Sequence, residues 1–412
     1  MTTLLQQSQN AKKSLVFELL LGALAALFFS AFLYLEHYGF TLKLLNTLFG
    51  LVALAFLLYM PKRAILAAGF LIGLAWFYWI GYSFKYQNVG FMTPFITFGF
   101  ALVYMLFFGV LALTNKIYLR ALLLFGLSFI EPFDFNWMQI EVIFVDSYIG
   151  VFKYQLALVL AALSLPSSIK TEWKFVPLLL LFGALNFYTP AQKDAPLKIK
   201  LVATHILQEQ KWQRENLSKT IAMVYREIER AREEGYDVVV LPESVFPLYM
   251  NKNPQIMNTL LEYSHSISIV TGALLYENEQ NYNVTYMFQN GTYEVAKKMV
   301  LVPFGEYIPL PSFAKKIIND TFFAGASDFI GASKPTDFTI KGVKFRNAVC
   351  YEATCSELYE GEVHYMLAIS NNAWFAPSVE PTLQKLLMRF YARKNGVTIY
   401  HSANSSGTGI VK

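Results

Sequence analysis

Charged side chains are scarce in this sequence. Aspartate, glutamate, lysine and arginine account for 15% of its 412 residues, whereas soluble proteins carry about 25%. The scarcity is concentrated in the first half, which contains long runs almost free of charge, while the second half has the composition of a globular domain. Together with a mean hydropathy of +0.38, this unevenness predicts a membrane part followed by a soluble part.

Other absences exclude several classes of function. The two cysteines, Cys350 and Cys355, do not amount to a disulfide framework. The five histidines are scattered, and no two stand at the spacing of metal ligands, so no metal site is expected. No phosphate-binding loop or dinucleotide fingerprint is present, and no cofactor is expected. The net charge of +5 forms no basic stripe, which argues against nucleic acid as a partner.

The first half contains seven apolar segments separated by short loops. A helix needs roughly 20 apolar residues to cross a bilayer, and the fifth and seventh segments are shorter. We predict about seven membrane spans, at Ser14–Tyr34, Leu42–Met60, Ala64–Phe84, Val89–Leu113, Leu119–Ile130, Tyr148–Leu165 and Phe175–Phe187. A cleaved signal peptide is a poor explanation of the first segment, because no small-residue cleavage site follows it and further spans do.

Basic residues alternate from loop to loop along this half. They gather in every second connection, at Lys12–Lys13, Lys62–Arg63, Lys116 with Arg120, and Lys170 with Lys174. Because short loops rich in lysine and arginine stay in the cytoplasm, we expect a cytoplasmic N-terminus and place everything after about residue 191 outside. One intervening loop, Glu131–Asp146, is acidic and aromatic. It either covers a lipid-facing site or is a plain solvated loop.

The second half follows a Pro-containing hinge and alternates strand and helix patterns. Amphipathic periodicity predicts helices at Trp212–Glu234, Pro254–Tyr263 and Thr382–Asn395. Strands are predicted at Leu197–Ile206, Asp237–Leu241, Ile267–Tyr276, Tyr282–Gln289, Thr292–Val302, Val343–Cys350, Met366–Ser370 and Val397–Ser402. Turn signals at Asn290–Gly291 and Lys341–Gly342 indicate hairpins. We therefore predict a transmembrane domain at 1–190 and an α/β domain with a mixed sheet at 191–412.

Three strand ends in the second half carry chemically useful side chains. Glu243 follows the uniformly apolar Val238–Leu241, Lys298 begins a strand, and Cys350 follows Val343–Val349. A thiol becomes a good nucleophile only when a base or a cation promotes loss of its proton. Glu243 is suited to act as that base, and Lys298 to lower the thiol pKa and stabilise an oxyanion. Taken singly, a buried cysteine is more often inert, and a strand-end glutamate or lysine is more often solvated.

Four short motifs are specific in combination. They are LPES at 241–244, LVPFGEYIP at 301–309, CYE at 350–352 and SNNAWF at 370–375. With the preceding spans and hinge, they resemble the apolipoprotein N-acyltransferase family, which are bacterial inner-membrane enzymes. The resemblance covers nearly the whole chain. It implies an α-helical multi-span membrane domain carrying a nitrilase-like α/β domain, folded as an α-β-β-α sandwich.

The resemblance also implies a role for individual residues. It makes Glu243 the general base, Lys298 the oxyanion-stabilising lysine and Cys350 the nucleophile. Two glutamates match positions that support this triad, and two aromatic residues match positions near the acyl site: Glu306, Glu352, Tyr351 and Trp374. The second cysteine, Cys355, is expected to be a buried small residue.

The implied reaction is a ping-pong acyl transfer at the periplasmic side of the inner membrane. A phospholipid is the acyl donor, a cysteine thioester is the intermediate, and the α-amino group of a diacylglyceryl apolipoprotein is the acceptor. Two apolar or aromatic loops, Pro303–Phe313 and Phe322–Ile330, are expected to reach into the lipid. The family usually continues with a further strand and a closing transmembrane helix, whereas this sequence stops at Ser406–Lys412 with no closing span. Either the sequence is truncated or this branch of the family lacks that anchor.

Two other functions are compatible with parts of the sequence. A membrane-anchored nitrilase or amidase would use the same three residues on a small substrate. A transporter with a non-catalytic outer domain would need polar residues inside the spans, where few are found.

Overall fold

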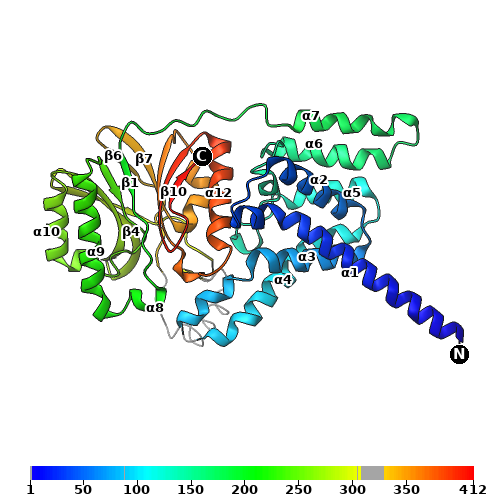
Figure 1. The fold of residues 1–412 in the computed structure, drawn as a ribbon, viewed down its shortest axis with the longest axis horizontal. Helices are drawn as coiled ribbons and strands as arrows, with labels where there is room; N and C mark the ends of the chain where they lie inside the picture. The colour runs from blue at the N-terminus through cyan, green and yellow to red at the C-terminus, as the bar shows by residue number, and fades with distance from the viewer. Residues whose placement is uncertain (1, 88, 304, 308–328) are drawn as a thin grey trace. The chain divides into compact units, whose positions relative to one another are not determined.

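The computed structural model describes residues 2–87, 89–303, 305–307 and 329–412. The chain divides into two compact units (Figure 1). The helical unit comprises residues 1–81, 91–132 and 138–188. The α/β unit comprises residues 189–412 and also two short segments from the first half of the chain, 82–90 and 133–137.

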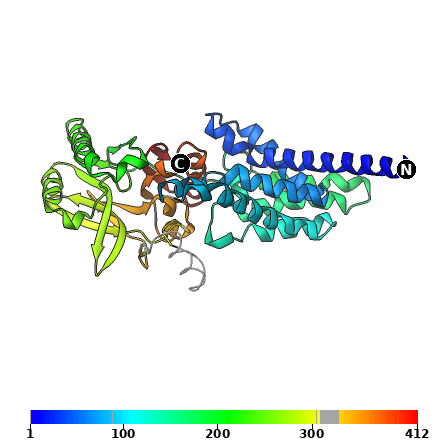
Figure 2. The same cartoon turned by 90° about the horizontal axis from the view of Figure 1, so that it is seen from below.

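Seven α-helices build the described part of the helical unit. They are α1 (Thr2–His37), α2 (Lys43–Tyr59), α3 (Lys62–Phe77), α4 (Thr93–Gly109), α5 (Ile117–Leu127), α6 (Lys153–Ser164) and α7 (Leu180–Ala184). The longer 3₁₀ segments in the first half of the chain are η1 (Ile80–Gln87), η5 (Ile140–Phe144) and η7 (Glu172–Leu179). Helix α1 packs against α2 and α3, α3 against α4, and α6 against α5 and α7 (Figures 1 and 2).

Each predicted span coincides with helix in the structure, but the helices differ in their capacity to cross a bilayer. Among the described residues, the helices at Ser14–His37 and Gly90–Leu113 are each long and apolar enough to do so. Helix α3 and the following Ile80–Tyr86, bent by 44°, make a third candidate when taken together. The remaining helices are shorter, so the predicted total of seven stays a prediction.

A buried arginine closes the end of α2. Four carbonyl groups at a helix C-terminus lack partners within the helix, and an apolar environment makes unpaired carbonyls costly. The guanidinium of Arg120 donates to the carbonyl oxygens of Leu58 at 2.9 Å and Met60 at 2.8 Å, and its Nε donates to that of Thr114 at 3.0 Å. This predicted loop residue is therefore a structural cap.

The predicted outer loop Glu131–Asp146 is not a solvated loop. Every side chain from residue 135 to residue 147 is buried. Its segment 133–137 belongs to the α/β unit, so the interpretation as a plain solvated loop is wrong.

Two five-stranded mixed sheets form the centre of the α/β unit. The first has the order β1-β2-β3-β4-β5, with bounds Ile199–Leu201, Val238–Val240, Ser268–Glu277, Gln280–Gln289 and Thr292–Lys297. The second has the order β10-β9-β8-β7-β6, with bounds Gly409–Val411, Thr398–Asn404, Tyr365–Asn371, Val343–Val349 and Asp337–Ile340. Strands β1, β2 and β3 are parallel, as are β7, β8 and β9, and the remaining pairs are antiparallel.

The uniformly apolar strands are explained by burial of both sheet faces. Successive side chains of a strand point to opposite faces. In β2, Val238 and Val240 join a core shared with the second sheet, while Val239 packs under the helices on the outer face. Those helices are α9 (Arg214–Glu233) and α10 (Pro254–Tyr263), and α12 (Glu380–Asn395) lies beside the second sheet (Figure 1). The result is the predicted α-β-β-α layering.

Predicted and observed elements differ mainly at strand ends. The returning strand predicted to run to Val302 stops at Lys297, so Lys298 lies just beyond its end. Strands β6 and β10 were not predicted. The short helix α8 (Gln208–Lys211) precedes α9 and was also not predicted. Most of the two loops expected to reach lipid, Pro303–Phe313 and Phe322–Ile330, lies outside the described residues.

Candidate active site

The predicted base lies at a tight turn after β2. Ser244, the next residue, has a left-handed backbone with φ +46°, and the turn packs directly on Gly272 of β3. A Cβ on Gly272 would lie 2.4 Å from the backbone nitrogen of Ser244 and 2.7 Å from Cα of Glu243. Only glycine permits this approach. The Glu243 carboxylate is buried and accepts hydrogen bonds from the Asn283 amide and from the backbone N–H of Asn371, each at 2.8 Å.

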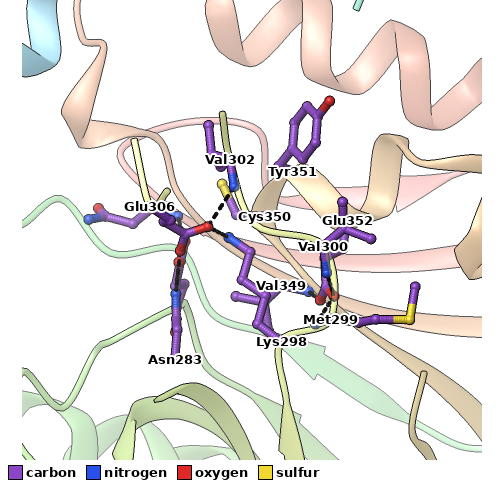
Figure 3. A network of polar contacts seen from close by, with 12 residues as sticks. Asn283, Lys298, Met299, Val300, Val302, Glu306, Val349, Cys350, Tyr351 and Glu352 are labelled. Carbon is purple, nitrogen blue, oxygen red and sulfur yellow. Dashed lines mark hydrogen bonds and ion pairs between the residues drawn. The ribbon is translucent and has the colours of Figure 1, made fainter. Parts of the chain in front are cut away.

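Lys298 and Glu306 form a buried ion pair (Figure 3). The lysine Nζ lies 2.7 Å from Oε2 of Glu306, and the lysine side chain is 1% exposed. Glu306 also accepts the N–H of Val302 at 2.9 Å and the amide of Asn283 at 3.3 Å. Burial alone would lower the pKa of Lys298, but the carboxylates of Glu306 and Glu243 outweigh it and hold that pKa above its ordinary value. The ammonium therefore stays charged.

Cys350 follows β7 in a left-handed backbone conformation with φ +57°. Its sulfur lies 3.7 Å from Nε2 of Gln384 on α12. Burial raises the pKa of the Cys350 thiol well above its ordinary value, Glu243 raises it further, and Lys298 opposes both. The predicted lowering of the thiol pKa by Lys298 thus exists as one contribution but does not prevail. The resting residue is a neutral thiol.

Glu352 links the cysteine strand to the lysine segment (Figure 3). Its Oε2 accepts the N–H of Val349 at 2.7 Å, and its Oε1 accepts those of Met299 at 2.5 Å and Val300 at 3.0 Å. Burial raises the pKa of Glu352 to about 7, although Lys298 and these N–H donors oppose the shift. The carboxyl group therefore fixes the positions of the residues beside Cys350 and Lys298.

The two predicted aromatic residues lie in different surroundings. The Tyr351 ring stacks on Phe135, with centroids 5.9 Å apart, and on Trp137 at 6.2 Å. Its hydroxyl accepts the backbone N–H of Asn136 at 3.1 Å. Tyr351 thus anchors the segment 133–137. Trp374 lies in a short 3₁₀ turn after β8, with its ring edge-on to Tyr86 at 5.6 Å.

Cys355 has the surroundings expected of it. It is 2% exposed, and its thiol donates to the carbonyl oxygen of Tyr351 at 3.4 Å. The prediction of a buried small residue is confirmed.

Two charged residues near the site, Lys211 and Glu380, are buried, and the sequence pattern does not predict their burial. Lys211 is 2% exposed, and its ammonium donates to the carbonyl oxygen of Glu243 at 3.0 Å. Burial lowers the pKa of Lys211 to about 8, partly offset by Glu243 and Cys350. Glu380, in the first turn of α12, is 1% exposed. Both stand in polar sequence that indicates a solvent-facing helix, so no local signal marks them as buried.

Comparison with known proteins adds sequence relationships to this geometry. The family model of the apolipoprotein N-acyltransferase integral membrane domain matches residues 16–187. An integral membrane domain of this family joined to a two-sheet α/β domain defines a class, the membrane-bound acyltransferases.

The chain belongs to the apolipoprotein N-acyltransferase family. It is 45% identical over 388 residues to the apolipoprotein N-acyltransferase of Wolinella succinogenes, an alignment covering 94% of each chain. It is 37% identical to that of Helicobacter hepaticus, over 92% of this chain and 96% of the relative. The predicted family, fold class and acyltransferase activity are confirmed, and this assignment replaces the amidase and transporter alternatives.

Similarity to solved structures is weaker. XC1258 from Xanthomonas campestris, a CN-hydrolase superfamily protein, is 14% identical with a TM-score of 0.39, over 51% of this chain and 76% of that chain. An amidase from Nesterenkonia sp. is 15% identical with a TM-score of 0.38, over 54% and 81%. These scores are too low to support a conclusion, and the family assignment rests on the sequence relatives.

Proposed function

We propose that Cys350 is the nucleophile, Glu243 the general base and Lys298 the oxyanion-stabilising cation of this acyltransferase. Because the pKa of the Cys350 thiol is raised, the thiolate has to be generated by a base during the reaction. Glu243 is the buried carboxylate suited to that task. Lys298 stays protonated because carboxylates raise its pKa, so its charge is available to a carbonyl oxygen that becomes negative.

The first half-reaction forms the acyl-enzyme. The sulfur of Cys350 attacks the ester carbonyl carbon of a phospholipid while Glu243 takes the thiol proton. The tetrahedral intermediate carries its negative charge on oxygen, near Lys298. Its collapse breaks the bond to the glycerol oxygen, which receives the proton from Glu243 and leaves as a lysophospholipid.

The second half-reaction transfers the acyl chain to nitrogen. The α-amino group of the S-diacylglyceryl cysteine of an apolipoprotein attacks the thioester, and Cys350 leaves as a thiol once Glu243 has returned the proton. The product carries an amide-linked acyl chain. Both substrates are membrane lipids, so an integral membrane domain supports this choice of donor and acceptor.

One observation carries the proposal. The amide of Asn283 donates to both Glu243 and Glu306, at 2.8 and 3.3 Å, and Glu306 is paired with Lys298 at 2.7 Å. The base and the cation are therefore held in one connected network, and both act electrostatically on the thiol of Cys350. Such a shared network is typical of groups that serve a single transition state.

Acyl labelling tests the proposal. Purified enzyme is incubated with phospholipid labelled in its acyl chain, and thioester-bound label is measured. Cys350→Ala should carry no label, and Cys355→Ala should be labelled like the wild type. Adding a diacylglyceryl-cysteine peptide with a free N-terminus should move the label to the peptide. Label on Cys355, or none on the wild type, contradicts the proposal.

We also propose that about seven helices cross a bacterial inner membrane, with residues 1–190 as the membrane domain and the catalytic domain, 191–412, in the periplasm. The alternation of basic loops supports this orientation. A reporter fused after Thr189 should be active only in the periplasm, and one fused after Lys116 only in the cytoplasm. The reverse result at both positions would show that the orientation is inverted.

A further inference from the structure

The carboxyl group of Glu380 is buried, and one of its oxygens has no hydrogen-bond partner among the described residues. The residue is 1% exposed, and the unpaired oxygen is Oε2. Leaving a buried polar atom unpaired is costly, and most native proteins contain few such atoms. This oxygen is therefore available to a partner that arrives from outside the chain.

Glu380 lies on the side of α12 that faces the nucleophile. Residues four apart on a helix occupy one face, with Cβ atoms about 5–6 Å apart. The residue one turn further on is Gln384, whose Nε2 lies 3.7 Å from the sulfur of Cys350. Gln384 is itself held by the amide of Asn372 at 3.1 Å. The carboxyl group with the unpaired Oε2 thus belongs to a residue one helical turn from Gln384, which contacts the sulfur of Cys350.

The two buried lysines described near the site, Lys298 and Lys211, have other partners. Lys298 is paired with Glu306 at 2.7 Å, and Lys211 donates to the carbonyl oxygen of Glu243 at 3.0 Å. Burial raises the pKa of Glu380 well above its ordinary value, and the nearby Glu243 raises it further. Glu380 therefore holds a proton more tightly than an ordinary carboxyl group does, and neither of these two lysines is paired with it.

We propose that Glu380 binds the α-amino group of the acceptor during the second half-reaction, an inference that rests on the proposed acyl transfer. An α-amino group has an ordinary pKa of about 7.7–8.0, so much of it arrives as ammonium. It is the cationic group that has to reach the acyl carbon on Cys350. The reacting ester of the donor phospholipid is uncharged and offers a buried carboxyl group no comparable partner.

The proton balance closes with Glu380 in this role. When the ammonium enters, Glu380 releases its proton to solvent and forms an ion pair. The ammonium then gives one proton to Glu380, which leaves a neutral amine and restores the acid. The nitrogen lone pair forms the bond to the thioester carbon, and the carbonyl electrons move to oxygen. Glu243 takes the second proton from nitrogen and returns it to the sulfur of Cys350 as the carbon–sulfur bond breaks.

The test separates the two half-reactions in the full-length enzyme. Acyl-enzyme is formed from labelled phospholipid, and its decay is then followed after adding a diacylglyceryl-cysteine peptide. Glu380→Gln keeps the shape of the side chain and removes its capacity to ionise and to exchange a proton. We expect thioester formation within about 3-fold of the wild type and transfer to the peptide slowed by about 10-fold or more, as for loss of a charge-assisted hydrogen bond. Glu380→Asp should recover part of the transfer rate.

Two controls identify the step. Glu357→Gln removes an exposed glutamate seven residues after the nucleophile and should change neither rate. Hydroxylamine is an uncharged nucleophile at neutral pH that needs no counter-ion, and it should discharge wild-type and Glu380→Gln acyl-enzymes equally. Equal loss of thioester formation and transfer in Glu380→Gln, or no loss of either, overturns the assignment of Glu380.

A different experimental result would contradict the proposed acyl transfer itself. If the wild-type enzyme forms no thioester, or its thioester is never transferred to the peptide, the proposed acyl transfer itself is wrong. If the wild type completes both steps and Glu380→Gln does so at the same rates, the acyl transfer stands and only the role of Glu380 is overturned.

Discussion

The ammonium of Lys298 lies 2.7 Å from Oε2 of Glu306, and the two side chains are 1% and 13% exposed. Removing one partner of a buried ion pair leaves an uncompensated charge and costs about 3–5 kcal/mol. The pair also connects Lys298, the proposed oxyanion-stabilising cation, to Glu243, because Asn283 donates to both glutamates. The position and the charge of the Lys298 ammonium therefore depend on Glu306, Asn283 and Glu243 together.

Neutralising Glu306 should shift the pH dependence of acylation. Glu306 raises the pKa of Lys298, so Glu306→Gln lowers that pKa and lets the lysine lose its proton at lower pH. The rate of thioester formation should then fall at alkaline pH in the variant while the wild type retains its rate. At neutral pH we expect a loss of about 10-fold, as for loss of a hydrogen bond to a charged group. Single-turnover rates across pH measure both effects. Parallel profiles for the two enzymes would contradict the assignment.

The three proposed catalytic residues should behave as a unit. Losing a general base typically costs about 10²–10⁴ in rate, and losing an oxyanion donor about 10²–10³. We expect Glu243→Gln and Lys298→Met each to slow thioester formation by at least about 10²-fold. The double variant should be little worse than the poorer single one, because effects of cooperating groups are not additive. A wild-type rate for Lys298→Met would reduce the triad to a cysteine–glutamate pair.

Adding one methyl group at Gly272 should displace the base. The new Cβ of Gly272→Ala would meet backbone atoms of Glu243 and Ser244 at 2.7 and 2.4 Å, and backbone yields less readily than a side chain. We expect thioester formation to fall by at least about 10²-fold, as for loss of the base, and the thermal midpoint of the α/β unit to drop. Gly126→Ala is the matched control, because its Cβ would meet nothing within 4 Å. Wild-type activity in Gly272→Ala would show that the turn adjusts without consequence.

His401 should make the α/β unit sensitive to acid. The buried ring contacts the carbonyl oxygen of Gly407 at 2.8 Å and the hydroxyl of Ser370 at 2.7 Å, and burial lowers its pKa to about 4. The unfolded chain, with an ordinary pKa of about 6.5, binds the proton more readily. This residue's contribution is therefore complete above pH 6.5 and lost as the pH falls towards about 4, an effect of about 2–3 kcal/mol.

Variant melting curves isolate that contribution. His401→Gln does not titrate, so its thermal midpoint should fall less than that of the wild type between pH 7 and pH 4.5. A difference of about 5–10 °C corresponds to the expected free energy. His364→Gln, at an exposed histidine, should follow the wild type. Identical pH dependence in all three proteins would contradict the role of His401.

Residues at the ends of apolar strands were predictable from sequence, whereas residues buried by distant packing were not. Glu243 closely follows β2, whose three valines reflect burial on both faces, and Cys350 directly follows β7, in which Phe345 and Val349 face the core between the sheets. The burial of Lys211 and Glu380 depends on how α8 and α12 meet the sheets, and their local sequence is that of a solvated helix. Strands β6 and β10, with 4 and 3 residues, are too short to produce a periodic signal.

The sequence also does not predict that the segment 133–137 packs in the α/β unit. It stands between two apolar segments and therefore belongs by sequence to the membrane half, yet Phe135 and Trp137 stack on Tyr351. Asn136 donates its side-chain amide to the carbonyl oxygen of Thr354 at 2.6 Å. Nothing in the local pattern specifies a partner more than 200 residues away in the chain.

Because two segments of the first half of the chain belong to the α/β unit, the protein cannot be divided into its two units by one cut. A single cut at the hinge would leave the second half of the chain without 82–90 and 133–137, which belong to its own unit, and would expose the aromatic face of Tyr351, the residue after Cys350. The two halves of the chain therefore cannot be exchanged independently of each other. A gene fusion that placed a freestanding α/β domain behind a set of membrane helices would need later co-adaptation of both segments. Chimaeras exchanged at residue 189 should lose activity unless those segments are exchanged with them.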